Sequence, residues 1–107
     1  MLHIDAAGPV TWVGESQLAL TLLDEVAYET RHLRLAPGDT LLVVTDGLLE
    51  VFDGDDRELG YEGLRAAVAA AGAQASLADL ERAVFDACRT HGGQSDDQTM
   101  LIVRRTV

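Results

Sequence analysis

The sequence contains no lysine: its eight basic residues are all arginine, and eighteen acidic residues leave a formal net charge of −10. An acidic surface repels phosphate backbones and anionic lipid, so we expect no nucleic acid and no membrane among its partners. The same surface attracts positive ions. The excess of acidic residues therefore favours a cation as ligand.

Cysteine and long apolar segments are also scarce. The single cysteine, Cys88, excludes an internal disulfide and a zinc cluster of thiolates within the chain. No apolar run approaches the ~18 residues of a membrane span, and the N-terminus lacks a basic stretch followed by an apolar one. We therefore expect a cytoplasmic protein. Its 107 residues, 48% of them hydrophobic and 24% charged, are typical of one small globular domain or of part of a larger one.

Turn residues divide the first half of the chain into short extended segments. Residues 2–13 predict two short strands around a turn, and residues 14–26 fit a loop or a short strand. Residues 27–35 look extended and are followed by a strong turn signal at 36–39. The clearest strand is 40–45 (TLLVVT), an apolar run short enough to be buried on both faces.

The second half predicts two helices and a last strand. Residues 61–71 have helical apolar spacing, and Ser76 begins a capping box for a helix that continues to about His91. The apolar positions expected to pack against the sheet are Leu64, Val68, Leu77, Leu80, Val84 and Cys88. Residues 99–105 predict the last strand. The whole predicts an α+β fold, a mostly antiparallel sheet with the helix pair inserted between its last two strands.

Two acidic segments stand next to the clearest strands. Asp46 directly follows the strand 40–45, and Asp96 and Asp97 directly precede the last strand. If the two strands are neighbours, these carboxylates converge at one edge of the sheet and form an oxygen-only site, which suits Mg²⁺ or Mn²⁺ and not zinc or copper. The alternatives are structural, since Asp46-Gly47 is also a common turn and Asp96-Asp97 could be an exposed loop pair.

The motifs around these acids resemble those of a known family. In order and spacing they are similar to the C-terminal half of SpoIIE-type phosphatase domains, which are metal-dependent serine/threonine phosphatases of the protein phosphatase 2C superfamily. The matching motifs are Gly38-Asp39-Thr40, Thr45-Asp46-Gly47 with Glu50, and Asp96-Asp97-x-Thr99. The resemblance is good over 36–104 and weak over 1–35. It implies that residues 1–107 form a single partial domain, half of an α/β/β/α sandwich.

The resemblance also implies roles for individual residues. Asp46 and Asp96 would bind the same Mn²⁺ or Mg²⁺ ion. The positions expected beside these ligands are Gly47, Glu50, Asp97 and Thr99. The implied reaction is metal-dependent hydrolysis of phosphoserine or phosphothreonine. The implied substrate is a phosphorylated regulatory protein, such as an anti-anti-sigma factor in bacterial signalling.

The resemblance is incomplete in one respect. The N-terminal half of such domains carries a Gly-Asp motif whose aspartate bridges two metal ions, and this sequence has no counterpart of it. We therefore expect the isolated chain to be inactive as a phosphatase. The alternative function is that of a non-catalytic interaction module or dimerising fragment, which retains the fold and forms a homo-oligomer through exposed sheet edges.

Overall fold

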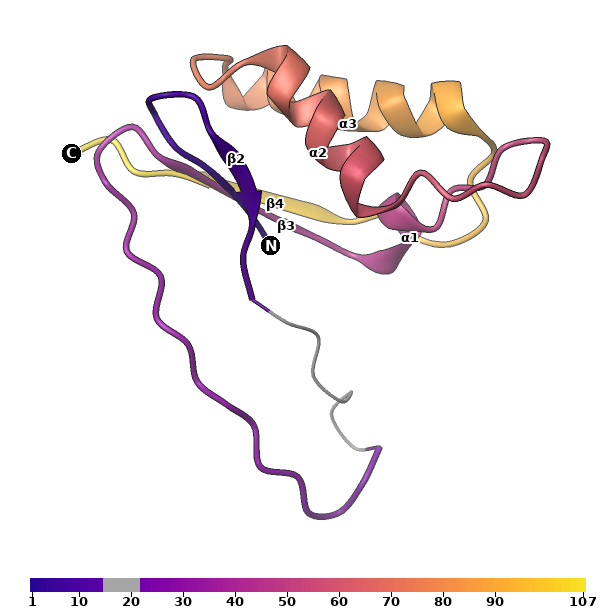
Figure 1. Cartoon of the computed structure of the whole chain (residues 1–107), viewed down its shortest axis with the longest axis horizontal. Coiled ribbons are helices and arrows are strands. Elements are labelled where there is room, and N and C mark those ends of the chain that lie inside the picture. Colours follow the sequence, from indigo (N-terminus) through magenta and orange to yellow (C-terminus); the bar gives the residue numbers. More distant parts are fainter. Residues whose placement is uncertain (15–21) are drawn as a thin grey trace.

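The computed structural model describes residues 1–14 and 22–107. In chain order its elements are β1 (Leu2–Ile4), β2 (Val10–Trp12), β3 (Thr40–Val44), α1 (Asp46–Leu49), α2 (Gly60–Ala71), α3 (Leu77–His91) and β4 (Met100–Arg104) (Figure 1). The two predicted N-terminal strands, both predicted helices and the last strand are confirmed. Most of the segment predicted as loop or short strand, residues 15–21, lies outside the described residues.

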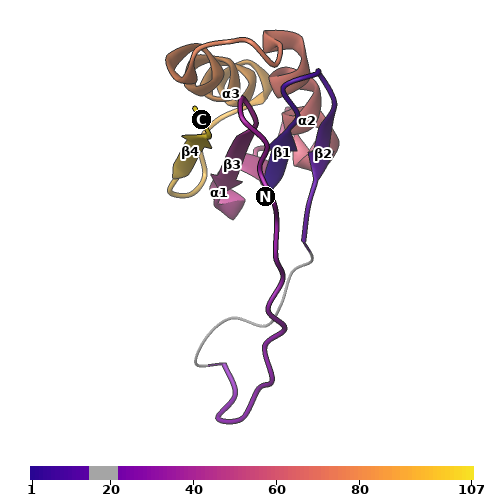
Figure 2. The ribbon, with the colours of Figure 1, turned by 90° about the vertical axis from the view of Figure 1, so that its left-hand side faces the viewer.

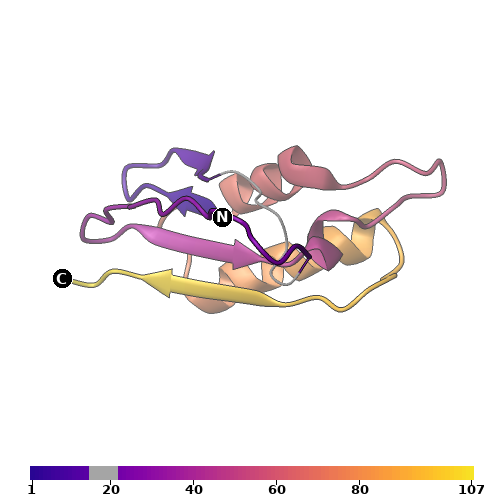
Figure 3. The same cartoon turned by 90° about the horizontal axis from the view of Figure 1, so that it is seen from below.

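The four strands form one antiparallel sheet in the order β2-β1-β3-β4. β3 and β4 lie side by side, with Thr40 opposite Arg104 and Val44 opposite Met100 (Figure 3). The helices come between these two strands in the chain, so the α+β arrangement and its insertion are confirmed. The antiparallel register places the end of β3 beside the start of β4.

Helices α2 and α3 cover one face of the sheet (Figure 2). The core between the two layers contains Leu2, Ile4, Val10, Leu42, Leu48, Leu49, Val51, Leu64, Val68, Leu80, Val84 and Cys88. Helix α2 ends at Gly72, whose φ of 89° lies in the left-handed region that favours glycine. Helix α3 begins after Ser76, whose side chain accepts a hydrogen bond from the Asp79 amide. Among the described residues, no helix is long and apolar enough to cross a membrane.

One predicted core position is wrong. Leu77 is 40% exposed, whereas the other five apolar positions of the two helices are buried. Leu77 occupies the first turn of α3 and borders a surface pocket together with Met100 and Ile102. Those two residues belong to β4, an edge strand of the sheet, so no further strand formed by residues 1–14 or 22–107 reaches across to cover Leu77.

The prediction that the strand 40–45 is buried on both faces is also wrong. On the helix side, Thr40 and Leu42 are fully buried, but Leu41 and Val43 on the other side are only half-buried. The reason is that helices cover a single face of the sheet (Figure 2). The segment 22–35 runs away from the sheet, and residues 27–35, which were predicted to be extended, form no strand (Figure 1).

Candidate metal centre

Asp46 stands at the junction between strand β3 and helix α1. Thr45 ends the strand in an extended conformation, with φ of −90° and ψ of 163°, and Asp46 is the first residue of the helix. The structural alternative considered for Asp46-Gly47 was a turn. Instead the chain makes one helical turn, closed by a 2.8 Å hydrogen bond from the Glu50 amide to the Asp46 carbonyl.

The loop before β4 packs directly onto helix α1. A Cβ atom built on Gly47 would lie only 2.0 Å from the Asp97 carbonyl oxygen, so only glycine permits this approach without a shift of the backbone. The Gln98 side chain donates to the Gly47 carbonyl at 3.0 Å. The Thr45 amide donates to the Thr99 carbonyl at 3.1 Å, and the Thr99 amide donates to the Thr45 hydroxyl at 3.0 Å. The structure thus brings the two acidic motifs together through their backbones.

The carboxylates of these motifs are open to solvent. Asp46, Glu50, Asp96 and Asp97 are all exposed. Asp96 accepts a hydrogen bond from the Asp97 amide at 2.7 Å, an interaction that orients its carboxylate locally. The backbone carbonyl of Glu50 accepts a hydrogen bond from the Ser95 hydroxyl at 3.4 Å. Glu50 and Thr99 are therefore tied to the same loop–helix contact as the predicted ligands.

The donor set is small. Within residues 1–14 and 22–107, no group of three or more His, Cys, Asp or Glu side chains is placed to hold a metal ion. Asp46 lines a pocket of about 430 Å³, whereas Asp96 and Asp97 line a separate, open depression. Two exposed carboxylates with no nitrogen or sulfur donor fit a hard divalent cation that keeps most of its water ligands.

Asp39 is a buried acid with a different role. It is 4% exposed and accepts hydrogen bonds, each of 2.9 Å, from the amides of Ala6 and Ala36 and from the His3 ring. The Ala6 amide, the His3 ring and the Ala36 amide together lower the pKa of Asp39 from 3.8 to about 2. Asp39 precedes β3 and Asp46 follows it, so roughly 20 Å of extended chain separates the two acids. Asp39 therefore anchors the strand and is no candidate for a further ligand.

Cys88 is a structural thiol, as its place on the apolar stripe of α3 predicts. It is 2% exposed, and its sulfur donates to the Leu48 carbonyl at 3.5 Å. Burial raises the pKa of the thiol. The contact ties helix α3 to α1 and so supports the backbone on which Asp46 stands.

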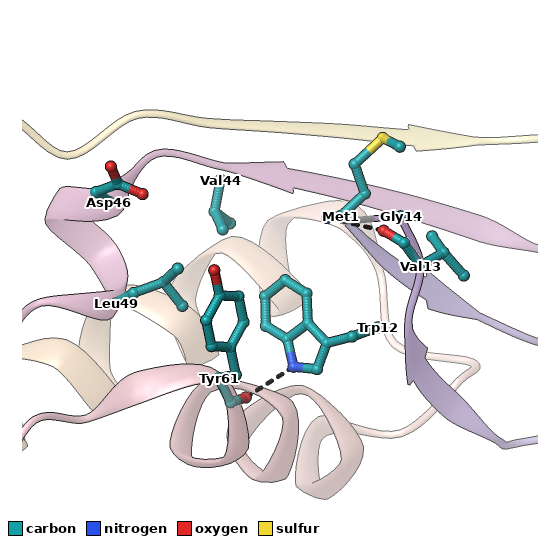
Figure 4. A pocket seen from close by; sticks show the side chains of 8 residues that line it. All are labelled: Met1, Trp12, Val13, Gly14, Val44, Asp46, Leu49 and Tyr61. Atoms are coloured by element: carbon teal, nitrogen blue, oxygen red, sulfur yellow. Dashed lines mark hydrogen bonds between the residues drawn. The ribbon is translucent and has the colours of Figure 1, made fainter. Parts of the chain in front are cut away.

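Sequence reasoning missed the pocket beside Asp46. Its walls include Trp12 from β2 and Tyr61 from the first turn of α2, residues that are far apart in the chain (Figure 4). Their ring centroids are 4.8 Å apart at an interplanar angle of 88°, and the indole donates to the Tyr61 backbone carbonyl at 2.9 Å. Because both aromatics are isolated in the sequence, no local spacing could have joined them.

Comparison with known proteins agrees with this architecture. A family model described as Stage II sporulation protein E (SpoIIE) matches residues 1–106. A search of the curated proteins found no match. Among solved structures, the chain is similar to the SiaA-PP2C domain of Pseudomonas aeruginosa, with 24% identity and a TM-score of 0.74. That similarity covers 96% of this chain but 42% of the solved chain, so the present chain spans less than half the length of that chain.

Proposed function

Because the chain belongs to the SpoIIE family, we propose that it forms the C-terminal part of a phosphatase domain that dephosphorylates phosphoserine or phosphothreonine on a regulatory protein. The observation that supports this most is the contact between Gly47 and the Asp97 backbone. It joins the segment that carries Asp46 to the segment that carries Asp96. The domain assignment of residues 1–107 as a single partial domain is part of the same proposal.

Asp46 and Asp96 would hold Mn²⁺ or Mg²⁺ in this function. When bound, such an ion supplies a Lewis acid for the phosphoryl oxygens and lowers the pKa of a bound water. The chain's own residues position the ligands. The paired backbones of Thr45 and Thr99 fix the strand ends, and Gly47 lets the Asp97 backbone approach. Asp97 and Glu50 add negative charge beside the site, which favours a cation.

The proposed substrate is a phosphorylated regulatory protein of the anti-anti-sigma type, and the proposed location is the cytoplasm. The acidic surface, with a net charge of −10, supports a protein substrate over a nucleic acid. We propose that the isolated chain turns over substrate negligibly, because it supplies two ligand carboxylates and no bridging aspartate.

Binding tests this function better than turnover. We expect a phosphoserine peptide to bind the wild-type chain in the presence of Mn²⁺ by calorimetry, and the unphosphorylated peptide not to bind. Asp46→Asn should abolish the metal-dependent binding, whereas Asp55→Asn, at an exposed position in the turn 53–58, should retain it. Phosphopeptide binding that is equal with and without Mn²⁺, or equal in Asp46→Asn, would contradict the proposal.

A second candidate function is that of an interaction module that pairs with another copy of the chain. The observation that favours it is the uncovered face of the sheet, where Leu41 lies opposite Val103 and Val43 opposite Leu101. Leu101 is 59% exposed and Val103 45% exposed. Self-association was expected at the sheet edges, and these exposed apolar residues of the uncovered face are a second place for it. Sedimentation that shows a dimer disrupted by Val103→Arg, together with no metal-dependent phosphopeptide binding, would favour this candidate over the phosphatase.

A further inference from the structure

An aromatic pocket opens directly beside the candidate metal ligand Asp46. It has a volume of about 430 Å³, and its apolar walls include Trp12, Val44, Leu49 and Tyr61. Asp46 lies toward one end of the pocket and Met1 toward the other, with the two aromatic rings between them (Figure 4). The pocket and the candidate metal centre therefore share one residue, Asp46.

The walls of this pocket are held in place by the fold. Leu49 is 5% exposed in the core, and Val44 ends the central strand β3. The indole of Trp12 is fixed by its hydrogen bond to the Tyr61 backbone and by edge-to-face contact with the Tyr61 ring. Tyr61 is 54% exposed, so its ring is accessible from solvent. An exposed aromatic ring in the wall of a pocket is typical of a ligand site.

We propose that this pocket binds an apolar side chain of the substrate, next to the phosphorylated residue. The inference rests on the proposed function, which places the phosphoryl group at Asp46. The charged groups that line the pocket are the Asp46 carboxylate and the Met1 ammonium. The ammonium donates a hydrogen bond to the Val13 carbonyl. Apart from Asp46, the side chains that line the pocket are aromatic or aliphatic, and polar atoms of the backbone and of Tyr61 lie among them. A leucine or phenylalanine side chain buries apolar surface against the two rings, Val44 and Leu49, whereas a polar side chain gains less from that contact.

Binding in this pocket can be measured with a residue of the chain itself. Trp12 is the single tryptophan of the sequence, so intrinsic indole fluorescence reports on the pocket alone. The probes are short phosphoserine peptides that are identical except for the residues flanking phosphoserine, which are leucine, asparagine or lysine. In the presence of Mn²⁺ we expect the leucine peptide to shift the Trp12 emission and to bind about tenfold more tightly than the asparagine peptide, a common effect of burying one apolar side chain. Equal affinities, or tightest binding of the lysine peptide, would overturn the proposal.

A pair of variants tests the pocket wall. Tyr61→Ala removes the ring but leaves the backbone carbonyl that accepts the Trp12 hydrogen bond, and it should abolish the preference for leucine over asparagine. Tyr61→Phe keeps the ring and should retain the preference. A preference that survives Tyr61→Ala unchanged would place the apolar contact elsewhere and overturn the proposal.

The Asp46→Asn variant separates this inference from the proposed function. If only the metal assignment is wrong, Asp46→Asn binds all peptides as the wild type does and the preference for leucine remains. If only the pocket assignment is wrong, binding of every phosphopeptide depends on Mn²⁺ and Asp46, but leucine and asparagine peptides bind equally.

Discussion

Gly47 and Asp97 meet backbone to backbone: a Cβ atom on Gly47 would lie 2.0 Å from the Asp97 carbonyl oxygen and 2.9 Å from its carbonyl carbon. This contact joins the end of β3 to the loop before β4, which are 50 residues apart in the chain. The approach needs a residue without a side chain. The glycine that the motif supplies next to Asp46 therefore determines where Asp96 and Asp97 can lie.

The first prediction is that Gly47→Ala destabilises the fold and disrupts the site. The added methyl group collides with backbone that cannot rotate away, and overpacking of this kind costs about 1–3 kcal/mol. Gly54→Ala is the matched control, because a Cβ at Gly54 meets nothing within 4 Å. Urea denaturation followed by circular dichroism measures both. Alanine forms helix more readily than glycine. If the loop did not contact Gly47, Gly47→Ala would therefore leave the free energy of unfolding unchanged or raise it, and either result would contradict the prediction.

The second prediction compares two leucines of helix α3. Leu80 is fully buried, so Leu80→Ala should lower the free energy of unfolding by about 2–5 kcal/mol, the cost of removing a core leucine. Leu77 is 40% exposed, so Leu77→Ala should cost less than about 1 kcal/mol. Denaturant titration of the two variants measures the difference. Similar losses at both positions would show that α3 does not pack on the sheet through the stripe of Leu80, Val84 and Cys88.

The sequence predicted best those features that depend on residues close together in the chain. Turn residues and apolar periodicity are local, and they predicted both helices and the Ser76 cap. The pairing of β3 with β4 was inferred differently, from the condition that the acidic motifs at the strand ends converge. Burial of Leu80, Val84 and Cys88 follows from the same periodicity. Helix α1, with four residues from Asp46 to Leu49, is too short to show a period and was not predicted; a turn at Asp46-Gly47 was considered as an alternative.

The features that the sequence could not predict depend on distant parts of the chain. Leu77 has the spacing of a core residue, and its exposure follows from the position of β4 at the sheet edge. The candidate site was predicted only as two motifs that converge. Its backbone contact at Gly47 and its aromatic pocket arise from long-range packing. Asp39 looked like part of a turn, and its anchoring role depends on His3 and Ala6, more than thirty residues earlier.

The third prediction concerns acid stability. The pKa of Asp39 is about 2 in the folded chain against an ordinary value of 3.8, because amides and the His3 ring stabilise the carboxylate. A depressed folded pKa means that the stabilisation is complete above the unfolded pKa and is lost as the pH falls from about 4 to about 2. The melting temperature of the wild type should therefore fall through this window.

Asp39→Asn provides the test of that assignment. The amide group places a donor where one of the three hydrogen-bond donors now points, so the variant should be less stable at pH 7 and its stability should depend less on pH between 4 and 2. Asp55→Asn, at an exposed position, should behave as the wild type does. If Asp39→Asn retains the full acid dependence, the loss of stability must come from other carboxylates.

The fourth prediction is that Mn²⁺ stabilises the fold through Asp46. Binding to the folded chain alone contributes about 1.4 kcal/mol at ten times the dissociation constant, which raises the melting temperature of a domain of this size by roughly 6–11 °C. Two exposed carboxylates are a weak site, so we expect the shift at millimolar metal, with Mn²⁺ more effective than Mg²⁺. Asp46→Asn should remove most of the shift, and Asp55→Asn should leave it unchanged. A Mn²⁺-induced shift of equal size in the wild type and in Asp46→Asn, measured by differential scanning fluorimetry, would show that the ion binds elsewhere on the acidic surface.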